Sequence, residues 1–115
     1  MDTGAILGEE FDYVIVATGH FSYPHDPHFE GEETFPGKYV HGHDFLDGKL
    51  FKDMRVLCIG GSYSSEDIAL QCWKFGAKVA HITHRSPALL AYPDWPETVI
   101  ERPILTKIEG SKVSQ

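Results

Sequence analysis

Hydrophobic residues in this chain are concentrated in short runs, each bounded by glycine, proline or charged residues. Residues 54–59 form a compact apolar run that is typical of a strand buried in a parallel sheet, and residues 78–83 form a second one. Residues 11–17 are the most β-branched and aromatic stretch and predict another strand, one that expects cover on both faces. A weaker run at residues 104–108 is compatible with a short strand near the C-terminus.

The interval between the first two runs has the periodicity of a helix that begins near Ser64 and stops at Gly76, a residue suited to the C′ position. The residues that fall on one face at helical spacing are Ile68, Cys72 and Phe75. Strand, tight glycine turn, helix and strand within about 30 residues form the opening unit of a dinucleotide-binding fold. The predicted fold class is therefore α/β, with a Rossmann-like dinucleotide-binding unit.

The turn itself reads Gly60-Gly61-Ser62-Tyr63-Ser64-Ser65 and suits a phosphate-binding loop. The two glycines let the backbone bend and approach a pyrophosphate closely, and the helix that follows presents free N–H groups and its positive dipole end. Serine stands at the second and third glycine positions of G-x-G-x-x-G, so the surrounding strand and helix carry the interpretation. The alternative is an ordinary βα turn that binds nothing and is capped by Ser64 with Asp67.

Arg85 lies just past the second strand, where an NAD site has an acidic residue for the ribose 2′-hydroxyl. An arginine there suits the extra 2′-phosphate of NADP, because a guanidinium pairs with phosphate in a forked geometry. Ser86 is a candidate to add a hydroxyl to the same phosphate. The alternative is a solvated arginine in a surface loop. The position favours NADP as the cofactor.

Composition narrows the class of protein. The chain has 115 residues, 42% of them hydrophobic and 23% charged, as in a globular domain with a core. A net charge of −7 argues against a nucleic-acid partner or an anionic membrane surface. No apolar run approaches the roughly 20 residues of a membrane span, and the start lacks the basic segment of a signal peptide, so we expect a cytoplasmic location.

Other constellations are weaker. Cys58 and Cys72 are not arranged as C-x-x-C and are expected to be buried free thiols. The five histidines that invite a metal interpretation lack cysteine partners and helical spacing, so we expect no metal ligands among them: His20, His25, His28, His41 and His43. The serines of the turn do not form G-x-S-x-G, and we assign no catalytic residue.

A specific resemblance rests on residues 35–45, Phe-Pro-Gly-Lys-Tyr-Val-His-Gly-His-Asp-Phe, which match F-x-G-x-x-x-H-x-x-x-[YF], the identifying sequence of flavin-containing monooxygenases. Residues 16–20 look like the ATG segment of that family, and the turn at residues 60–67 is similar to the bacterial branch that oxygenates trimethylamine. The related Baeyer–Villiger monooxygenases carry tryptophan where Phe45 stands. The resemblance covers roughly residues 9–105.

This resemblance implies part of a fold with two dinucleotide-binding domains. Residues 1–24 would be the tail strand of an FAD-binding domain, 25–50 a linker that carries the motif, and 51–115 part of an NADP-binding domain. The implied cofactors are NADP and FAD. The implied NADP contacts are Gly60, Gly61, Ser62, Tyr63, Ser64 and Ser65 at the pyrophosphate and Arg85 and Ser86 at the 2′-phosphate. Thr18 and Gly19 would lie near FAD, and His41 and Phe45 would pack the linker.

The implied activity is NADPH- and FAD-dependent oxygenation of an amine or a sulfide by O₂. The residues before Phe11 contain no G-x-G-x-x-G for FAD, so we expect the chain alone neither to hold FAD tightly nor to turn over. The alternative is a non-catalytic NADP-binding module, or a partner-dependent fragment whose exposed strands pair with another chain. A homo-oligomer is one form of such pairing.

Overall fold

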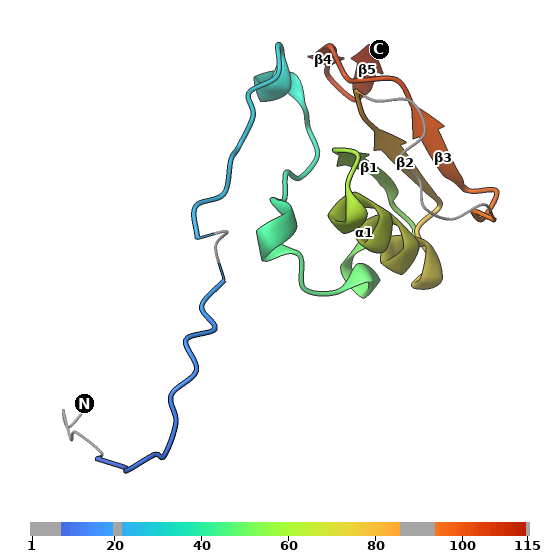
Figure 1. The fold of residues 1–115 in the computed structure, drawn as a ribbon. Coiled ribbons are helices and arrows are strands. Elements are labelled where there is room, and N and C mark those ends of the chain that lie inside the picture. Colours follow the sequence, from blue (N-terminus) through green and yellow to red (C-terminus); the bar gives the residue numbers. More distant parts are fainter. Residues whose placement is uncertain (1–7, 20–21, 86–93, 115) are drawn as a thin grey trace, which may run out of the picture.

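The computed structural model describes residues 8–19, 22–85 and 94–114 (Figure 1). Its main body is one α-helix, α1 (Tyr63–Lys74), on a three-stranded sheet. The strands of this sheet, in order, are β1 (Arg55–Ile59), β2 (Val79–Thr83) and β3 (Val99–Arg102). A separate two-stranded sheet is formed by β4 (Lys107–Glu109) and β5 (Lys112–Ser114). Three short 3₁₀ helices precede the sheet: η1 (Glu32–Thr34), η2 (Gly42–Asp44) and η3 (Gly48–Phe51).

The predicted strand–turn–helix–strand unit is confirmed. β1 and β2 lie parallel, with Arg55 opposite Val79 and Ile59 opposite Thr83. The ends of β1, α1 and β2 each fall within one residue of the prediction. These elements were predictable because their apolar patterns are local, and Cys58 of β1 and Ile82 of β2 lie in the core with Ala69 of α1.

Gly76 ends the helix as expected. It takes φ 92, and its N–H donates to the carbonyl of Trp73 at 3.0 Å. The N–H of Ala77 reaches back to the carbonyl of Cys72 at 2.9 Å. This pair of bonds is the Schellman arrangement, which satisfies two of the carbonyls left over at a helix end.

The core lies between α1 and one face of the sheet. Its buried members are Cys58, Ala69, Ala80, Ile82 and Val99, with Val56, Ile68 and Trp95 packed around them. Cys72 is also fully buried, whereas Ile68 and Phe75, the other two residues of the predicted apolar face, are half-buried. Both cysteines are free thiols, as expected.

β3 was not predicted, because the irregular composition after Pro87 suggested no strand. It pairs in parallel with β2, with Ala80 opposite Val99 and Thr83 opposite Arg102. Only Val99 and Ile100 supply a β-branched signal, and pairing with β2 determines the strand. The strand predicted at residues 104–108 is found only in part: Ile104–Thr106 lie in no strand, and β4 begins at Lys107.

The C-terminal strands β4 and β5 form a hairpin around Gly110, which has φ 56. The linker packs on this hairpin. Glu30 bridges to Lys107 in parallel, and its carbonyl accepts the N–H of Ile108 at 2.8 Å. Gly31 sits so close that a Cβ there would lie 2.0 Å from the carbonyl oxygen of Ile108.

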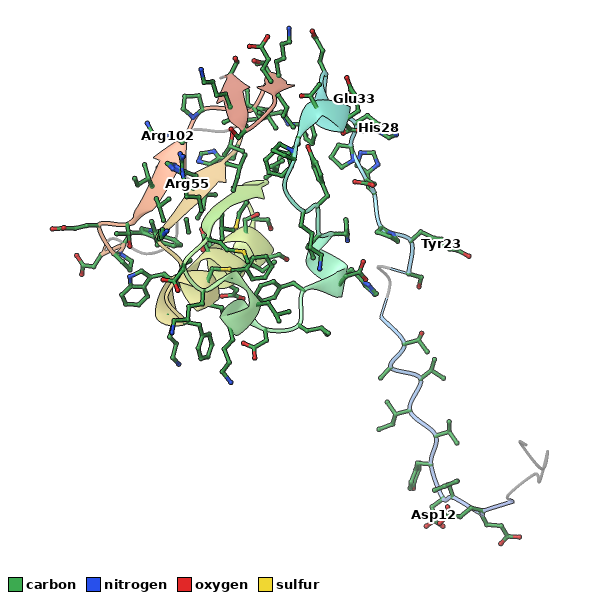
Figure 2. All side chains as sticks on the ribbon, turned by 180° about the vertical axis from the view of Figure 1, so that it is seen from behind. Asp12, Tyr23, His28, Glu33, Arg55 and Arg102 are labelled. Carbon is green, nitrogen blue, oxygen red and sulfur yellow. The ribbon has the colours of Figure 1, made fainter. Side chains whose placement is uncertain are left out.

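The strand predicted at residues 11–17 is wrong for this structure. Residues 8–19 belong to no strand, and the apolar side chains of this N-terminal arm are exposed, with Tyr13 at 89% and Ile15 at 87%. Figure 1 shows the arm running away from the sheet, and Figure 2 shows Asp12 near its far end. A strand is stabilised by ladder hydrogen bonds to a neighbour, and the described residues provide none here.

Candidate functional site

The turn from Gly60 lies at the carboxyl edge of the sheet. Gly60 follows the last residue of β1, and its N–H donates to the carbonyl of Thr83 on β2 at 2.9 Å. Its φ of 134 is a conformation that a residue with a side chain rarely adopts, and a Cβ there would lie 3.1 Å from the Oγ of Ser65. Glycine is therefore required at the point where the chain leaves the strand for α1. This edge is where open α/β sheets bind their ligands.

The N-terminus of α1 opens directly on this turn. Ser62 is the N-cap residue in extended backbone, and its carbonyl accepts the N–H of Ser65 at 2.9 Å. Within the described residues no side chain caps the helix, so the predicted capping box of Ser64 and Asp67 is wrong. The helix begins at Tyr63, and both residues lie inside it. A helix end without a side-chain cap leaves its first N–H groups for water or a ligand.

The residues predicted to hold the pyrophosphate are thus brought together in one turn. Tyr63 is 76% exposed, Ser62 and Ser64 are exposed, and Ser65 is half-buried under Gly60. Arg85 lies two residues past β2 on the same edge and is exposed. Ser86, its expected partner, lies outside the described residues.

Two residues at this edge were missed by the sequence analysis. His84 is buried, and its Nε2 lies 2.5 Å from Oε1 of Glu101 on β3. Thr83, the residue before His84, donates its hydroxyl hydrogen to the carbonyl of Pro103. His84 stands beside Arg85 and could have been noticed there. Its partner could not, because Glu101 belongs to the strand that was not predicted.

Thr18 and Gly19, the residues expected near FAD, are not brought to this edge. Both are exposed on the N-terminal arm, and Gly19 has φ 71 with no atom within 4 Å of its Cβ position. In Figure 1 the arm points away from the carboxyl edge of the sheet. The described residues around them form no cradle for a flavin, and their role near FAD stays a prediction.

The linker motif packs onto itself and toward α1. The ring of Phe35 covers Gly37, where a Cβ would lie 2.5 Å from the ring, and meets Tyr39 edge-on at 5.5 Å between centroids. His41 caps η2 by accepting the N–H of His43 at 3.1 Å. Phe45 stacks on Phe51 with centroids 5.7 Å apart. These contacts order the linker; that His41 and Phe45 pack between two nucleotide sites stays a prediction.

The sheet face opposite α1 carries a basic group. The Nε of Arg102 donates to Nδ1 of His81 at 3.3 Å, and Figure 2 shows Arg55 and Arg102 on this side of the sheet. Burial lowers the pKa of His81, and the charges of Arg102 and Arg55 lower it further. Burial and the two positive charges thus favour the uncharged form of His81.

A hollow among the described residues lies away from the turn. It has a volume of about 480 Å³ and is lined by Glu30, Gly31, Glu33, Thr34 and residues 107–110. Its glutamates would repel the phosphates of a dinucleotide. The turn is therefore the better candidate for the nucleotide site. Within the described residues, no three His, Cys, Asp or Glu side chains gather as a metal ion requires.

A parallel sheet, a glycine turn into a helix without a side-chain cap, and an arginine past the second strand together define an α/β dinucleotide-binding unit. The chain belongs to the pyridine nucleotide-disulphide oxidoreductase family, whose sequence profile matches residues 10–108. Its two cysteines lie on β1 and α1 in the core and do not form a C-x-x-C pair.

The comparisons also confirm the resemblance to flavin-containing monooxygenases. Trimethylamine monooxygenase of Methylocella silvestris is 50% identical over 105 residues, 91% of this chain and 23% of the relative. Senecionine N-oxygenase of Tyria jacobaeae is 38% identical over 104 residues, again 23% of the relative. The crystal structure of Tmm from Pelagibacter sp. matches with a TM-score of 0.78 and 45% identity over 90% of this chain and 23% of that chain.

The chain therefore spans about a quarter of the length of these relatives. Among the described residues, no helix combines the length and the apolar composition that crossing a bilayer requires.

Proposed function

We propose that this chain is the NADP-binding part of a flavin-dependent monooxygenase that uses NADPH and O₂ to oxygenate an amine or a sulfide. The observation that carries the proposal is the turn from Gly60 into α1, where a glycine at φ 134 precedes a helix that has no side-chain cap. Matches to trimethylamine monooxygenase and senecionine N-oxygenase support the class of reaction.

The residues of the turn fit a pyrophosphate. At Gly60 a side chain would crowd the Oγ of Ser65, so glycine keeps the turn open. The free N–H groups of the first turn of α1 face this turn. The exposed hydroxyls of Ser62 and Ser64 add donors. The positive end of the helix dipole favours the bound anion in addition.

Arg85 supports NADP over NAD. It is exposed on the same edge, two residues past β2. An NAD site has an acidic residue at this position, whereas a guanidinium here suits a ribose 2′-phosphate. We propose Ser86 as a second contact to that phosphate.

When bound, NADPH and FAD would supply the redox chemistry of the reaction with O₂. This chain would bind and orient the nicotinamide cofactor, and we propose Thr18 and Gly19 as its contribution to the FAD side. We retain the division into residues 1–24, 25–50 and 51–115 and the cytoplasmic location as parts of the proposal.

The exposed arm favours a second candidate function. Its apolar side chains, such as Tyr13 and Ile15, remain in solvent, and such a segment pairs readily with a sheet edge. On this alternative the chain is a partner-dependent NADP-binding module, with a further polypeptide or a second copy covering the arm.

Calorimetric titration of the purified chain with NADPH and NADH tests the proposal. We expect micromolar binding of NADPH, weaker binding of NADH, and loss of the difference in Arg85→Ala. Arg55→Ala is the matched control, because Arg55 is also exposed but lies at the amino end of β1. Equal affinity for both nucleotides in the wild type, or an equal effect of the two variants, contradicts the assignment of Arg85.

A further inference from the structure

The pair of His84 and Glu101 is a part-buried polar contact close to the proposed nucleotide site. The Nε2–Oε1 distance is 2.5 Å, and the side chain of His84 is only 5% exposed while that of Glu101 is 42% exposed. A hydrogen bond to a carboxylate is shorter and stronger than a neutral one. The ring is therefore fixed by a partner on the neighbouring strand.

Two further bonds fix the backbone at the same place. The N–H of Gly60 donates to the carbonyl of Thr83, which ties the end of β2 to the turn after β1. The hydroxyl of Thr83 donates to the carbonyl of Pro103, which ties it to the segment after β3. The last two residues before Arg85 are thus held from both sides of the sheet edge.

Arg85 directly follows these two held residues, Thr83 and His84. Its side chain is exposed, and an exposed arginine has many rotamers to lose when it binds a ligand. Forked recognition of a phosphate requires the guanidinium at a defined position. If the preceding residue is held in place, Arg85 loses less conformational entropy when it binds the phosphate.

His84 has one feature that its pairing leaves unexplained. Among the described residues, its Nδ1 is buried without a hydrogen-bond partner. An unsatisfied buried polar atom is destabilising, so an apolar residue would suit this position better if His84 served packing alone. The hydrogen bond between Nε2 and Glu101 is the interaction that an apolar residue could not make here.

We propose that the His84–Glu101 pair is a positioning element that holds Arg85 in place for a 2′-phosphate and so sets the preference for NADP over NAD. The proposal rests on the proposed function of the turn and of Arg85. It adds a specificity-determining pair that touches no nucleotide atom itself.

The test compares 2′,5′-ADP with 5′-AMP, because only the first carries the 2′-phosphate. Calorimetry gives both affinities for the wild type, Glu101→Ala, Glu101→Gln and His84→Gln, and thermal unfolding shows that each variant is folded. We expect Glu101→Ala to weaken 2′,5′-ADP about tenfold, in the range typical of lost supporting contacts, with 5′-AMP unchanged. Glu101→Gln should recover part of the loss, because its amide oxygen still accepts a hydrogen bond. His84→Gln should behave likewise, because its amide N–H can still donate to Glu101.

Glu97→Gln is the matched control, since Glu97 is an exposed acid in the turn just before β3. A fall of both affinities together with the unfolding temperature assigns the pair a structural role only and overturns the inference. An unchanged ratio in Glu101→Ala overturns it as well. If the wild type already binds the two ligands equally, the proposed role of Arg85 fails first and the inference falls with it.

Discussion

At the scale of single residues, burial determines what the two thiols can do. Cys58 lies on β1 in the core, and burial raises its pKa to about 12, with a smaller contribution from Cys72. Burial also raises the pKa of Cys72. Neither thiol is a nucleophile near neutral pH, because the thiolate is the reactive form. The expectation of inert, structural cysteines could be reached from their positions in apolar runs alone.

The shift of Cys58 makes stability depend on pH. The thiol of the unfolded chain ionises near the ordinary value of 9.0, whereas that of the folded chain ionises near 12. Between these values the unfolded state binds fewer protons, so the free energy of unfolding falls as the pH rises from about 9 to 12. Urea unfolding across this range should show a shallower fall in Cys58→Ala than in the wild type. Identical slopes would mean that the thiol titrates normally.

At the scale of elements, the sequence predicts whatever its own local pattern stabilises. β1, α1 and β2 were predicted to within one residue, because apolar spacing and the Gly76 terminus are local signals. β3 was not, because two apolar residues become a strand only beside β2. The hairpin of β4 and β5 carried a readable signal in Gly110-Ser111, a glycine-led two-residue turn.

The site shows the same division. The turn from Gly60 and the place of Arg85 follow from the strand–turn–helix–strand pattern. The pairing of His84 with Glu101 depends on the register of β2 and β3, which is a tertiary property. Residues 11–17 have the composition of a strand, but composition alone supplies no neighbour to pair with.

Packing of η3 on α1 gives a prediction at this scale. Gly48 is buried, and a Cβ there would lie 2.5 Å from the carbonyl oxygen of Gln71 near the end of the helix. Gly48→Ala should lower the free energy of unfolding by about 1–3 kcal/mol, because backbone atoms must move apart. Gly42→Ala is the control, since its Cβ would make only an ordinary contact at 3.6 Å with Ile68. Equal losses in the two variants would show that η3 is not packed this closely.

At the scale of the whole molecule, the linker packs against the C-terminal hairpin. Gly110 donates its N–H to the hydroxyl of Thr34 at 2.8 Å, and Ile108 donates to the carbonyl of Glu30 at 2.8 Å. The linker therefore closes on the C-terminal hairpin while η2 and η3 contact α1. Among the described residues, 8–19 and 22–28 are exposed throughout.

The central claim is that the turn at the carboxyl edge binds the nucleotide. Amide chemical shifts, measured by NMR during titration of the isotope-labelled chain with NADP⁺, test it most directly. We predict that the amides of residues 60–65 and Arg85 move together and saturate at one affinity, while those of β5 stay in place. Shifts confined to the hollow between Glu30 and Lys107, or no saturable shifts at all, would contradict the account.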